Sequence, residues 1–435
     1  MKMFKDRTTG GFNVKTINLH NGVDLHIIDA PKFKTNLMSV YINIPLERET
    51  VTKAALLPSV LKRGCTKYPT IKELSHRLDE LYGASVSAGV RMKGDGEVLY
   101  FSAEYISDKF ADEGISRDMA EFIRDFIFSP ICENGGFLKS YVDGEKVNLK
   151  NAVLGLVNDK RAYTEFKCRE AMFGGEPYGM FEAGYIEDLD GIDEKNLYDF
   201  YKEVLSGGKV DIFISGTVDE SIIGYVCEML AKEFAPRDAE YILTSTAKLK
   251  GGKERLITEE ADTVQSKLCI GMRSGINALD PDYTAMVLAN CILGGSPFSK
   301  LFMNVREKLS LCYYAAARYA MMKGVLTISS GIQTENFKAA YDEINVQIEN
   351  MKKGEISDFE ISSAKKYLRN AYNSINDSLR GTEDYYLSQA ILSTDKSIDS
   401  LLNEIDRVSA DDVCRVMNKV ECDVVYFLKG TAAQE

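Results

Sequence analysis

Histidine is scarce in this sequence, because the 435 residues include only three, His20, His26 and His76. A zinc site would have to use these three or rely on carboxylates and thiols. His20 and His26 flank the dipeptide Asn21-Gly22 on predicted strands, where we expect polar side chains to face solvent. His76 lies on a predicted helix without a second histidine one turn away, the spacing that places two imidazoles on one metal ion. We therefore expect three surface residues and no metal site on this chain.

Long apolar runs and paired cysteines are also missing. No stretch approaches the roughly 18 uninterrupted apolar residues of a membrane span, and the first ten residues lack the apolar segment of a signal peptide. These absences predict a cytoplasmic protein. The nine cysteines include no C-x-x-C pair, which favours reduced, buried thiols over a disulfide framework. Cys65 with His76 is a possible cysteine-hydrolase pair, but Cys65 follows a helix-terminating glycine and is expected to be a turn residue.

Positive charge is in deficit as well. The 53 Lys and Arg residues face 65 Asp and Glu residues, which gives a formal net charge of -12. Such a charge repels nucleic acids and anionic membranes, so we expect neither as a partner. Three glycine pairs lack the G-x-x-x-x-G-K pattern of a phosphate loop and are expected to form turns and helix ends, namely Gly174-Gly175, Gly251-Gly252 and Gly294-Gly295.

The first hundred residues carry clear local signals. Alternating apolar and polar residues predict two strands joined at Asn21-Gly22, a dipeptide that suits a type I′ hairpin turn. Thr70 and Glu73 form a capping-box pattern at the start of a helix that runs to Tyr82. The other elements predicted in this unit are strands at 37–44, 85–92 and 97–105 and helices at 53–62 and 108–126.

This pattern occurs twice, which predicts an internal duplication. A shift of 230 residues superposes four features: Gly64 on Gly294, Leu81 on Leu311, Met92-Lys93-Gly94 on Met322-Lys323-Gly324, and Asp112-Glu113 on Asp342-Glu343. We therefore expect two homologous domains, 1–235 and 236–435, closed by strands at 209–218 and 423–428. Because strands and helices do not alternate regularly, each domain is predicted to be α+β, a mainly antiparallel sheet with helices packed on one face.

Several passages are similar to the M16 peptidases, the insulinase and mitochondrial processing peptidase family, over nearly the whole chain. The most specific are the glycine pair and serine-containing segment from Leu293 to Phe302 and the residues Arg306-Glu307-Lys308, Leu311 and Tyr313 that follow. The hairpin at Asn21-Gly22, the phrase Gly175-Glu176-Pro177-Tyr178-Gly179 and the strand end Ser215-Gly216 also resemble the family. The resemblance implies the fold of the LuxS/MPP-like metallohydrolases.

Active members of this family carry the inverted zinc motif H-x-x-E-H, in which two histidines bind zinc and the glutamate activates water. The matching positions here are Ala55, Pro58 and Ser59, and the position of a further glutamate ligand falls near Ala152. None of these residues can replace the chemistry of the motif, and Pro58 is expected to disturb a helix there. The resemblance thus implies a non-catalytic member of the family with no cofactor on this chain.

What survives of the family's site is Arg306 and Tyr313, with Tyr314 as an adjacent rival on the other strand face. The resemblance implies that this pair binds substrate beside zinc held by a homologous partner chain with H-x-x-E-H. We therefore predict a non-catalytic, substrate-binding subunit of a heteromeric peptide-processing enzyme. The alternatives are a structural or peptide-binding homodimer and a hydrolase that acts through other residues.

Overall fold

The structure of the chain is a computed structural model that describes residues 3–9, 12–111, 114–217 and 219–432; Asp112-Glu113 of the sequence repeat lies outside them. The chain divides into two compact units. Unit 1 combines Met1–Leu154, Phe181–Leu243 and Ile375–Asp395, and unit 2 combines Gly155–Met180, Thr244–Ser374 and Lys396–Glu435. A single cut after residue 235 does not reproduce this division, because each half of the sequence contributes a helix to the unit built mainly by the other half.

Unit 1 contains a seven-stranded sheet with the order β1-β2-β3-β9-β4-β6-β5. All neighbouring strands are antiparallel except β3 and β9, which are parallel. The hairpin of β2 and β3 turns at Asn21-Gly22, where Gly22 adopts a φ of 76° that glycine tolerates. The strands are β1 (Met3–Thr9), β2 (Phe12–His20), β3 (Val23–Asp29), β4 (Thr35–Pro45), β5 (Ser85–Lys93), β6 (Gly96–Ile106) and β9 (Lys209–Gly216), with a separate hairpin of β7 (Cys132–Glu133) and β8 (Gly136–Phe137).

Unit 2 repeats five of these strands. Its sheet has the order β10-β14-β11-β13-β12, which corresponds position by position to β3-β9-β4-β6-β5 of unit 1. The orientations also agree, since β10 and β14 are parallel and the remaining pairs are antiparallel. This match is what an internal duplication predicts. The strands are β10 (Arg255–Ala261), β11 (Ser266–Arg273), β12 (Cys312–Ala320), β13 (Val325–Ile332) and β14 (Glu421–Gly430).

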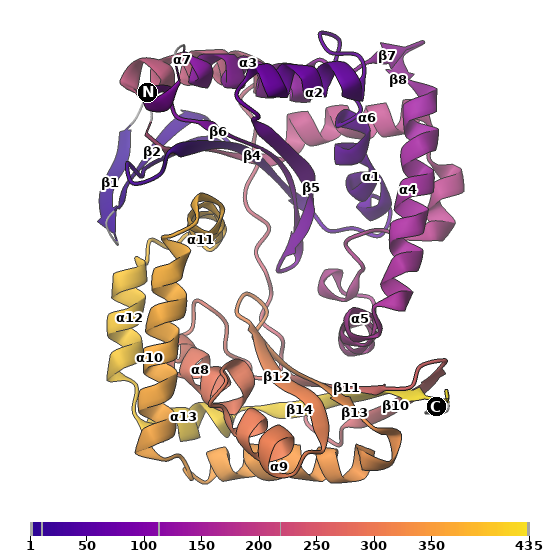
Figure 1. Cartoon of the computed structure of the whole chain (residues 1–435), viewed down its shortest axis with the longest axis vertical. Coiled ribbons are helices and arrows are strands. Elements are labelled where there is room, and N and C mark those ends of the chain that lie inside the picture. Colours follow the sequence, from indigo (N-terminus) through magenta and orange to yellow (C-terminus); the bar gives the residue numbers. More distant parts are fainter. Residues whose placement is uncertain (1–2, 10–11, 112–113, 218, 433–435) are drawn as a thin grey trace. The chain divides into compact units, whose positions relative to one another are not determined.

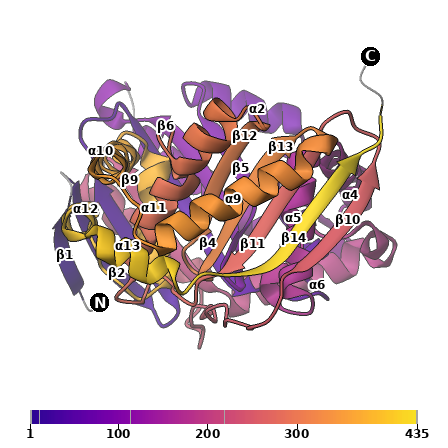
Figure 2. The same cartoon turned by 90° about the horizontal axis from the view of Figure 1, so that it is seen from below.

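Helices cover one face of each sheet, as the sequence predicted. Those of unit 1 are α1 (Val51–Leu61), α2 (Ile71–Glu80), α3 (Ile115–Phe128), α6 (Glu194–Gly207) and α7 (Glu220–Glu233), while α4 (Lys139–Asn158) continues into unit 2. Those of unit 2 are α8 (Tyr283–Asn290), α9 (Phe337–Lys352), α10 (Asp358–Ile375), α12 (Ile398–Arg407) and α13 (Ala410–Met417). Figure 2 shows α9 lying in front of the strands of its sheet. Among the described residues, no helix combines the length and apolarity needed to cross a bilayer.

Local chemistry explains most helix boundaries, with two corrections. Thr70 and Glu73 form the expected capping box at the start of α2. The helix predicted from residue 108 begins at Ile115 instead, because Asp108–Phe110 form a separate 3₁₀ turn. The expectation that Pro58 disturbs α1 is also wrong, because α1 continues through Pro58 to Leu61 and buries its ring. Burial of this apolar helix compensates for the hydrogen bond that proline cannot donate.

One helix in each unit packs on the opposite sheet face, and each comes from the other half of the sequence (Figure 1). In β4, Val40 and Ile42 join the core under the main helices, whereas Tyr41 points the other way and donates a hydrogen bond to Glu383 of α11 (Leu379–Ile391). In unit 2, α5 (Lys160–Phe173) packs on β11, where the Cys168 thiol lies 3.8 Å from the carbonyl oxygen of Cys269.

Candidate functional site

The positions of the zinc motif lie on helices of unit 1. Ala55 and Ser59 are one turn apart on α1 and half-buried, Pro58 is buried between them, and Ala152 is exposed on α4. A methyl group and a pyrrolidine ring have no lone pair for a metal ion, and a single hydroxyl is a poor zinc ligand. A nearby carboxylate of α4, Glu145, is paired with Arg63, the second residue after α1. Zinc therefore does not fit these residues.

No other metal site replaces the lost motif within the described part of the chain, where no three His, Cys, Asp or Glu side chains are grouped to hold an ion. His76 is exposed, and its Nδ1 lies 3.3 Å from Oε1 of Glu80, so the prediction of a surface residue is confirmed. His20 is half-buried, with Nε2 2.8 Å from the carbonyl oxygen of Ala231.

The expectation that His26 faces solvent is wrong, because its side chain is buried in the unit 1 sheet. Its strand β3 lies between β2 and β9, so neighbours on both sides enclose the ring. The Nε2 atom is 2.9 Å from Oδ1 of Asp211, and Nδ1 is 3.0 Å from Oγ1 of Thr16. Asp211 also accepts a hydrogen bond from Tyr241, and its pKa is lowered by Lys209 and His26 in spite of burial, which raises it. His26 is thus held in a structural network.

The Cys65 and His76 hydrolase pair is not assembled. Cys65 is buried, and its strand bridges join Tyr68 and Pro130. Burial raises the pKa of the Cys65 thiol, which disfavours the nucleophilic thiolate. His76 has Glu80 as its partner instead. The turn residue expected at Cys65 therefore fits the structure better than a catalytic cysteine.

Arg306 and Tyr313 line one pocket in unit 2, which has a volume of about 430 Å³. Arg306 lies in the π-helical segment Leu301–Lys308, and its guanidinium carbon lies 4.7 Å from the ring centroid of Phe302. Its Nε is 3.5 Å from Oε1 of Glu307, and 42% of the side chain remains exposed. The guanidinium is therefore oriented by a ring and a weak ion pair but remains accessible.

A β-bulge exposes Tyr313. Cys312 pairs with Ile332 and Tyr314 pairs with Gly331, so Tyr313 is an extra residue in the edge strand β12. Bulges redirect side chains at sheet edges. Tyr313 is 58% exposed as a residue and lines the pocket that also contains Arg306. The two residues expected to bind substrate are thus placed on one accessible surface.

Tyr314, the rival for the same role, faces a packed region. The guanidinium of Arg161 on α5 lies 4.6 Å from its ring centroid, and Ser329 donates a hydrogen bond to its hydroxyl at 3.5 Å. Burial raises the pKa of Tyr314. Its contacts hold α5 against the sheet, so Tyr313 is the better placed phenol for a ligand.

Gly294, in the segment from Leu293 to Phe302, lies where this segment packs closely on β12. A Cβ atom on Gly294 would lie 2.5 Å from the backbone nitrogen of Ala317 on β12. Only glycine lets the π-helical segment Cys291–Gly295 approach the strand so closely. This contact fixes the segment Cys291–Gly295, which precedes the segment that carries Arg306.

The sequence patterns missed the polar centre beneath α11. Glu383 is fully buried and accepts hydrogen bonds from the hydroxyls of Tyr41 at 3.0 Å and Ser215 at 2.7 Å. Burial raises the pKa of Glu383 to about 7, although these hydroxyls lower it. No local signal could reveal this centre, because Glu383 and Tyr41 are 342 residues apart in the chain.

Comparisons with known proteins identify the family of the chain. Residues 191–368, which include Arg306 and Tyr313, match the family described as "Peptidase M16 inactive domain". "Probable inactive metalloprotease YmfF" of Bacillus subtilis is 34% identical over 414 residues, covering 95% of this chain and 97% of the relative. The chain belongs to the M16 peptidase family. The "Uncharacterized zinc protease YmxG" of the same organism is 23% identical over 92% of this chain and 94% of that protein.

Two solved structures share the fold. A conserved protein from Enterococcus faecalis superposes with a TM-score of 0.89 at 30% identity, and the match covers 97% of this chain and 100% of that chain. A peptidase M16 inactive domain from Pseudomonas fluorescens has a TM-score of 0.79 at 17% identity, over 97% of this chain and 99% of that one. The family assignment and the missing ligands together identify an inactive M16 metalloprotease homologue.

Proposed function

We propose that this chain is the non-catalytic subunit of an M16-type zinc peptidase and helps to bind a peptide whose cleavage depends on a second, zinc-bearing chain. The observation that carries the proposal is the shared pocket of Arg306 and Tyr313. Both side chains remain accessible there, on a chain whose motif positions cannot hold zinc. Retention of the pair without the metal motif favours a binding role over independent hydrolysis.

The chemistry of the pair suits a peptide carbonyl. A guanidinium and a phenol both donate hydrogen bonds. They can hold and polarise a carbonyl oxygen, which assists hydrolysis without supplying the attacking water. Under this proposal the zinc and the general base belong to a homologue with H-x-x-E-H.

The relatives support the existence of such a partner. Bacillus subtilis contains both a relative named as an inactive metalloprotease and one named as a zinc protease, so both types occur in one organism. We expect the assembly in the cytoplasm, where a reducing environment suits the nine free cysteines.

The test is Arg306→Ala in the complex of this chain with its zinc-bearing homologue. Loss of the guanidinium should reduce peptide turnover by about tenfold or more, since a donor to a developing negative charge contributes at least that much. Complex formation, followed by size-exclusion chromatography, should not change.

Lys308→Ala is the matched control, because it removes an exposed positive charge from the same segment. Unchanged turnover with Arg306→Ala, or an equal loss with Lys308→Ala, would refute the shared site. A stable homodimer that binds peptides but no zinc-bearing homologue would instead establish the homodimeric alternative.

A further inference from the structure

A second pocket of unit 2 lies at the other end of β11 from the Arg306 pocket. The Arg306 pocket includes Gln333, the residue after β13, and β13 ends beside the first residue of β11. The second pocket includes Arg273, the last residue of β11, and has a volume of about 330 Å³. The rest of its lining comes from residues 250–253 and 255, before and at the start of β10, and from residues 421–423 at the start of β14. This volume is enough for a small ligand.

The lining of this pocket is cationic. Four of its side chains are positive and two are negative, on a chain whose formal net charge is -12. Glu254 lies between Lys253 and Arg255 in the sequence but is not part of the lining, because its carboxylate accepts a hydrogen bond from Tyr341 of α9 at 3.2 Å. The pocket therefore favours a negatively charged ligand.

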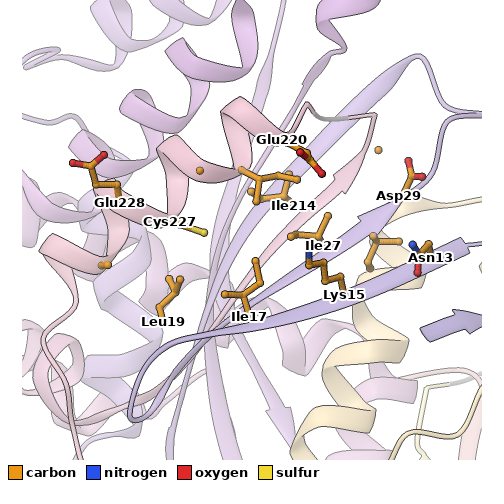
Figure 3. A pocket seen from close by; sticks show the side chains of 15 residues that line it. Asn13, Lys15, Ile17, Leu19, Ile27, Asp29, Ile214, Glu220, Cys227 and Glu228 are labelled. Atoms are coloured by element: carbon orange, nitrogen blue, oxygen red, sulfur yellow. The ribbon is translucent and has the colours of Figure 1, made fainter. Parts of the chain in front are cut away.

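The larger pocket of unit 1 offers less to such a ligand. Figure 3 shows this pocket beside α7, and its volume is about 780 Å³. Its sheet wall includes the core residues Ile17, Ile27 and Ile214, so this surface is already packed. Lys15 is the one cation in its described lining.

In the pocket of unit 2, one buried carboxylate, Asp423, faces three cations. The register of β11 and β14 shifts here, so that Asp423 is an extra residue in β14, and such bulges redirect a side chain. Its oxygens lie 2.7 Å from Nε of Arg273, 2.9 Å from a terminal nitrogen of Arg255 and 3.7 Å from Nζ of Lys250. Burial raises the pKa of Asp423, but hydrogen bonds from the two arginines lower it below its ordinary value. A single negative charge is thus shared by three positive ones.

Three of the four cations remain accessible to a ligand. The side chains of Lys250 and Arg255 are 52% and 49% exposed. Lys253 is also exposed, and within the described part of the chain it has no ion-pair or hydrogen-bond partner. Arg273 is buried and held by Asp423 and two backbone carbonyl oxygens, so it adds positive charge from a fixed position behind the others.

The loop that carries Lys250 and Lys253 already holds one carboxylate. Its residues Gly251 and Gly252 adopt φ angles of 62° and 103°, which glycine tolerates. The backbone N–H of Gly251 donates a hydrogen bond to Oε2 of Glu421 at 3.1 Å. A Cβ atom on either glycine would meet nothing within 4 Å, so the space next to the loop is open. Backbone N–H groups in such loops are suited to anions.

We propose that this pocket binds a small ligand through a phosphate group. A phosphate monoester carries a charge of about -1.5 to -2 near neutral pH and three strong acceptor oxygens, which matches the three accessible cations. Lys253 is its main contact because it has no competing partner, whereas Lys250 and Arg255 are shared with Asp423. Glu421 lies in the same lining and opposes the ligand's charge. The site shares no residue with the Arg306 pocket and does not depend on the proposed peptidase role.

The test is isothermal titration calorimetry of the full chain with inorganic phosphate, which should show saturable binding at one site. Acetate should bind at least about tenfold more weakly, because it carries less negative charge and fewer acceptor oxygens. Glycerol 3-phosphate distinguishes the two sources of the phosphate group. Tighter binding than phosphate assigns the site to a phosphate ester, and equal or weaker binding assigns it to inorganic phosphate itself.

Variants at exposed positions locate the binding. Lys253→Ala should weaken phosphate binding about fivefold, because an exposed charge-assisted hydrogen bond is lost, and Lys253→Arg should retain it. Glu421→Gln should strengthen binding about twofold, since it removes a like charge from the lining. Lys366→Ala is the matched control, because it removes an exposed lysine of α10 outside the pocket, and it should leave the affinity unchanged. Three results would overturn the proposal: no saturable binding of phosphate, equal affinity for acetate, or equal losses with Lys253→Ala and Lys366→Ala.

Discussion

Glu383 makes the attachment of α11 to the unit 1 sheet dependent on pH. Its carboxyl group is fully buried against the sheet face opposite the main helices, with Tyr41 and Ser215 as hydrogen-bond donors. Burial raises its pKa from an ordinary 4.5 to about 7. Protonation therefore favours the docked helix, since a neutral carboxyl loses less hydration on burial.

The magnitude follows from linkage between protonation and folding. The difference between 4.5 and about 7 corresponds to about 3 kcal/mol in the free energy of unfolding. Because the folded pKa is the higher one, this stabilisation is complete below pH 4.5 and is lost as the pH rises through 7. Glu383→Gln keeps a neutral group of similar size and removes the titration.

The assay is hydrogen exchange of the segment 379–391, measured by mass spectrometry at pH 5 and pH 8. Comparison of the two proteins at each pH cancels the intrinsic effect of pH on exchange. Relative to the natural chain, Glu383→Gln should gain about 2.5 kcal/mol in the opening free energy of α11 between the two pH values, because pH 5 lies just above the unfolded pKa of 4.5. Glu203→Gln, at an exposed position on α6, controls for the loss of one charge. An equal difference at both pH values would refute the reasoning.

Three further variants test other parts of the structure. Gly294→Ala should lower the free energy of unfolding by about 1–3 kcal/mol, because its Cβ atom would lie 2.5 Å from the Ala317 nitrogen; thermal denaturation against Gly155→Ala, whose Cβ atom enters open space, checks this. Tyr313→Phe should leave the free energy of unfolding within about 0.5 kcal/mol, because the residue is 58% exposed, while slowing cleavage by the assembled complex. A variant that restores the four motif positions combines Ala55→His, Pro58→Glu, Ser59→His and Ala152→Glu. Metal analysis of this variant should find one zinc per chain. Failure to bind zinc would contradict the assignment of these positions.

The sequence predicted elements that depend on local chemistry. The turn at Asn21-Gly22 and the capping box of Thr70 and Glu73 need only neighbouring residues, and both are confirmed. The mainly antiparallel α+β architecture is also confirmed. The sheets of the two units share a five-strand order, as expected for an internal duplication. Arg306 and Tyr313 share a pocket, but their role stays a prediction because geometry alone does not establish binding.

Features that depend on distant contacts could not be predicted. His26 alternates in sequence like a solvent-facing strand residue. It is buried because β9, some 185 residues later, lies beside its strand and places Asp211 next to the ring. Helices α5 and α11 have ordinary helical patterns, and nothing local shows that each packs in the unit formed mainly by the other half of the sequence. Pro58 illustrates the opposite case, since burial of α1 prevails over a strong local signal.

The central claim is that this chain works as a non-catalytic subunit beside a zinc-bearing homologue. Native mass spectrometry of the protein isolated from its own cells tests it most directly, because partner mass and bound zinc are recorded together. The account predicts a one-to-one complex with a second M16 chain of similar size and one zinc ion. A metal-free homodimer, or zinc bound to this chain alone, would contradict it.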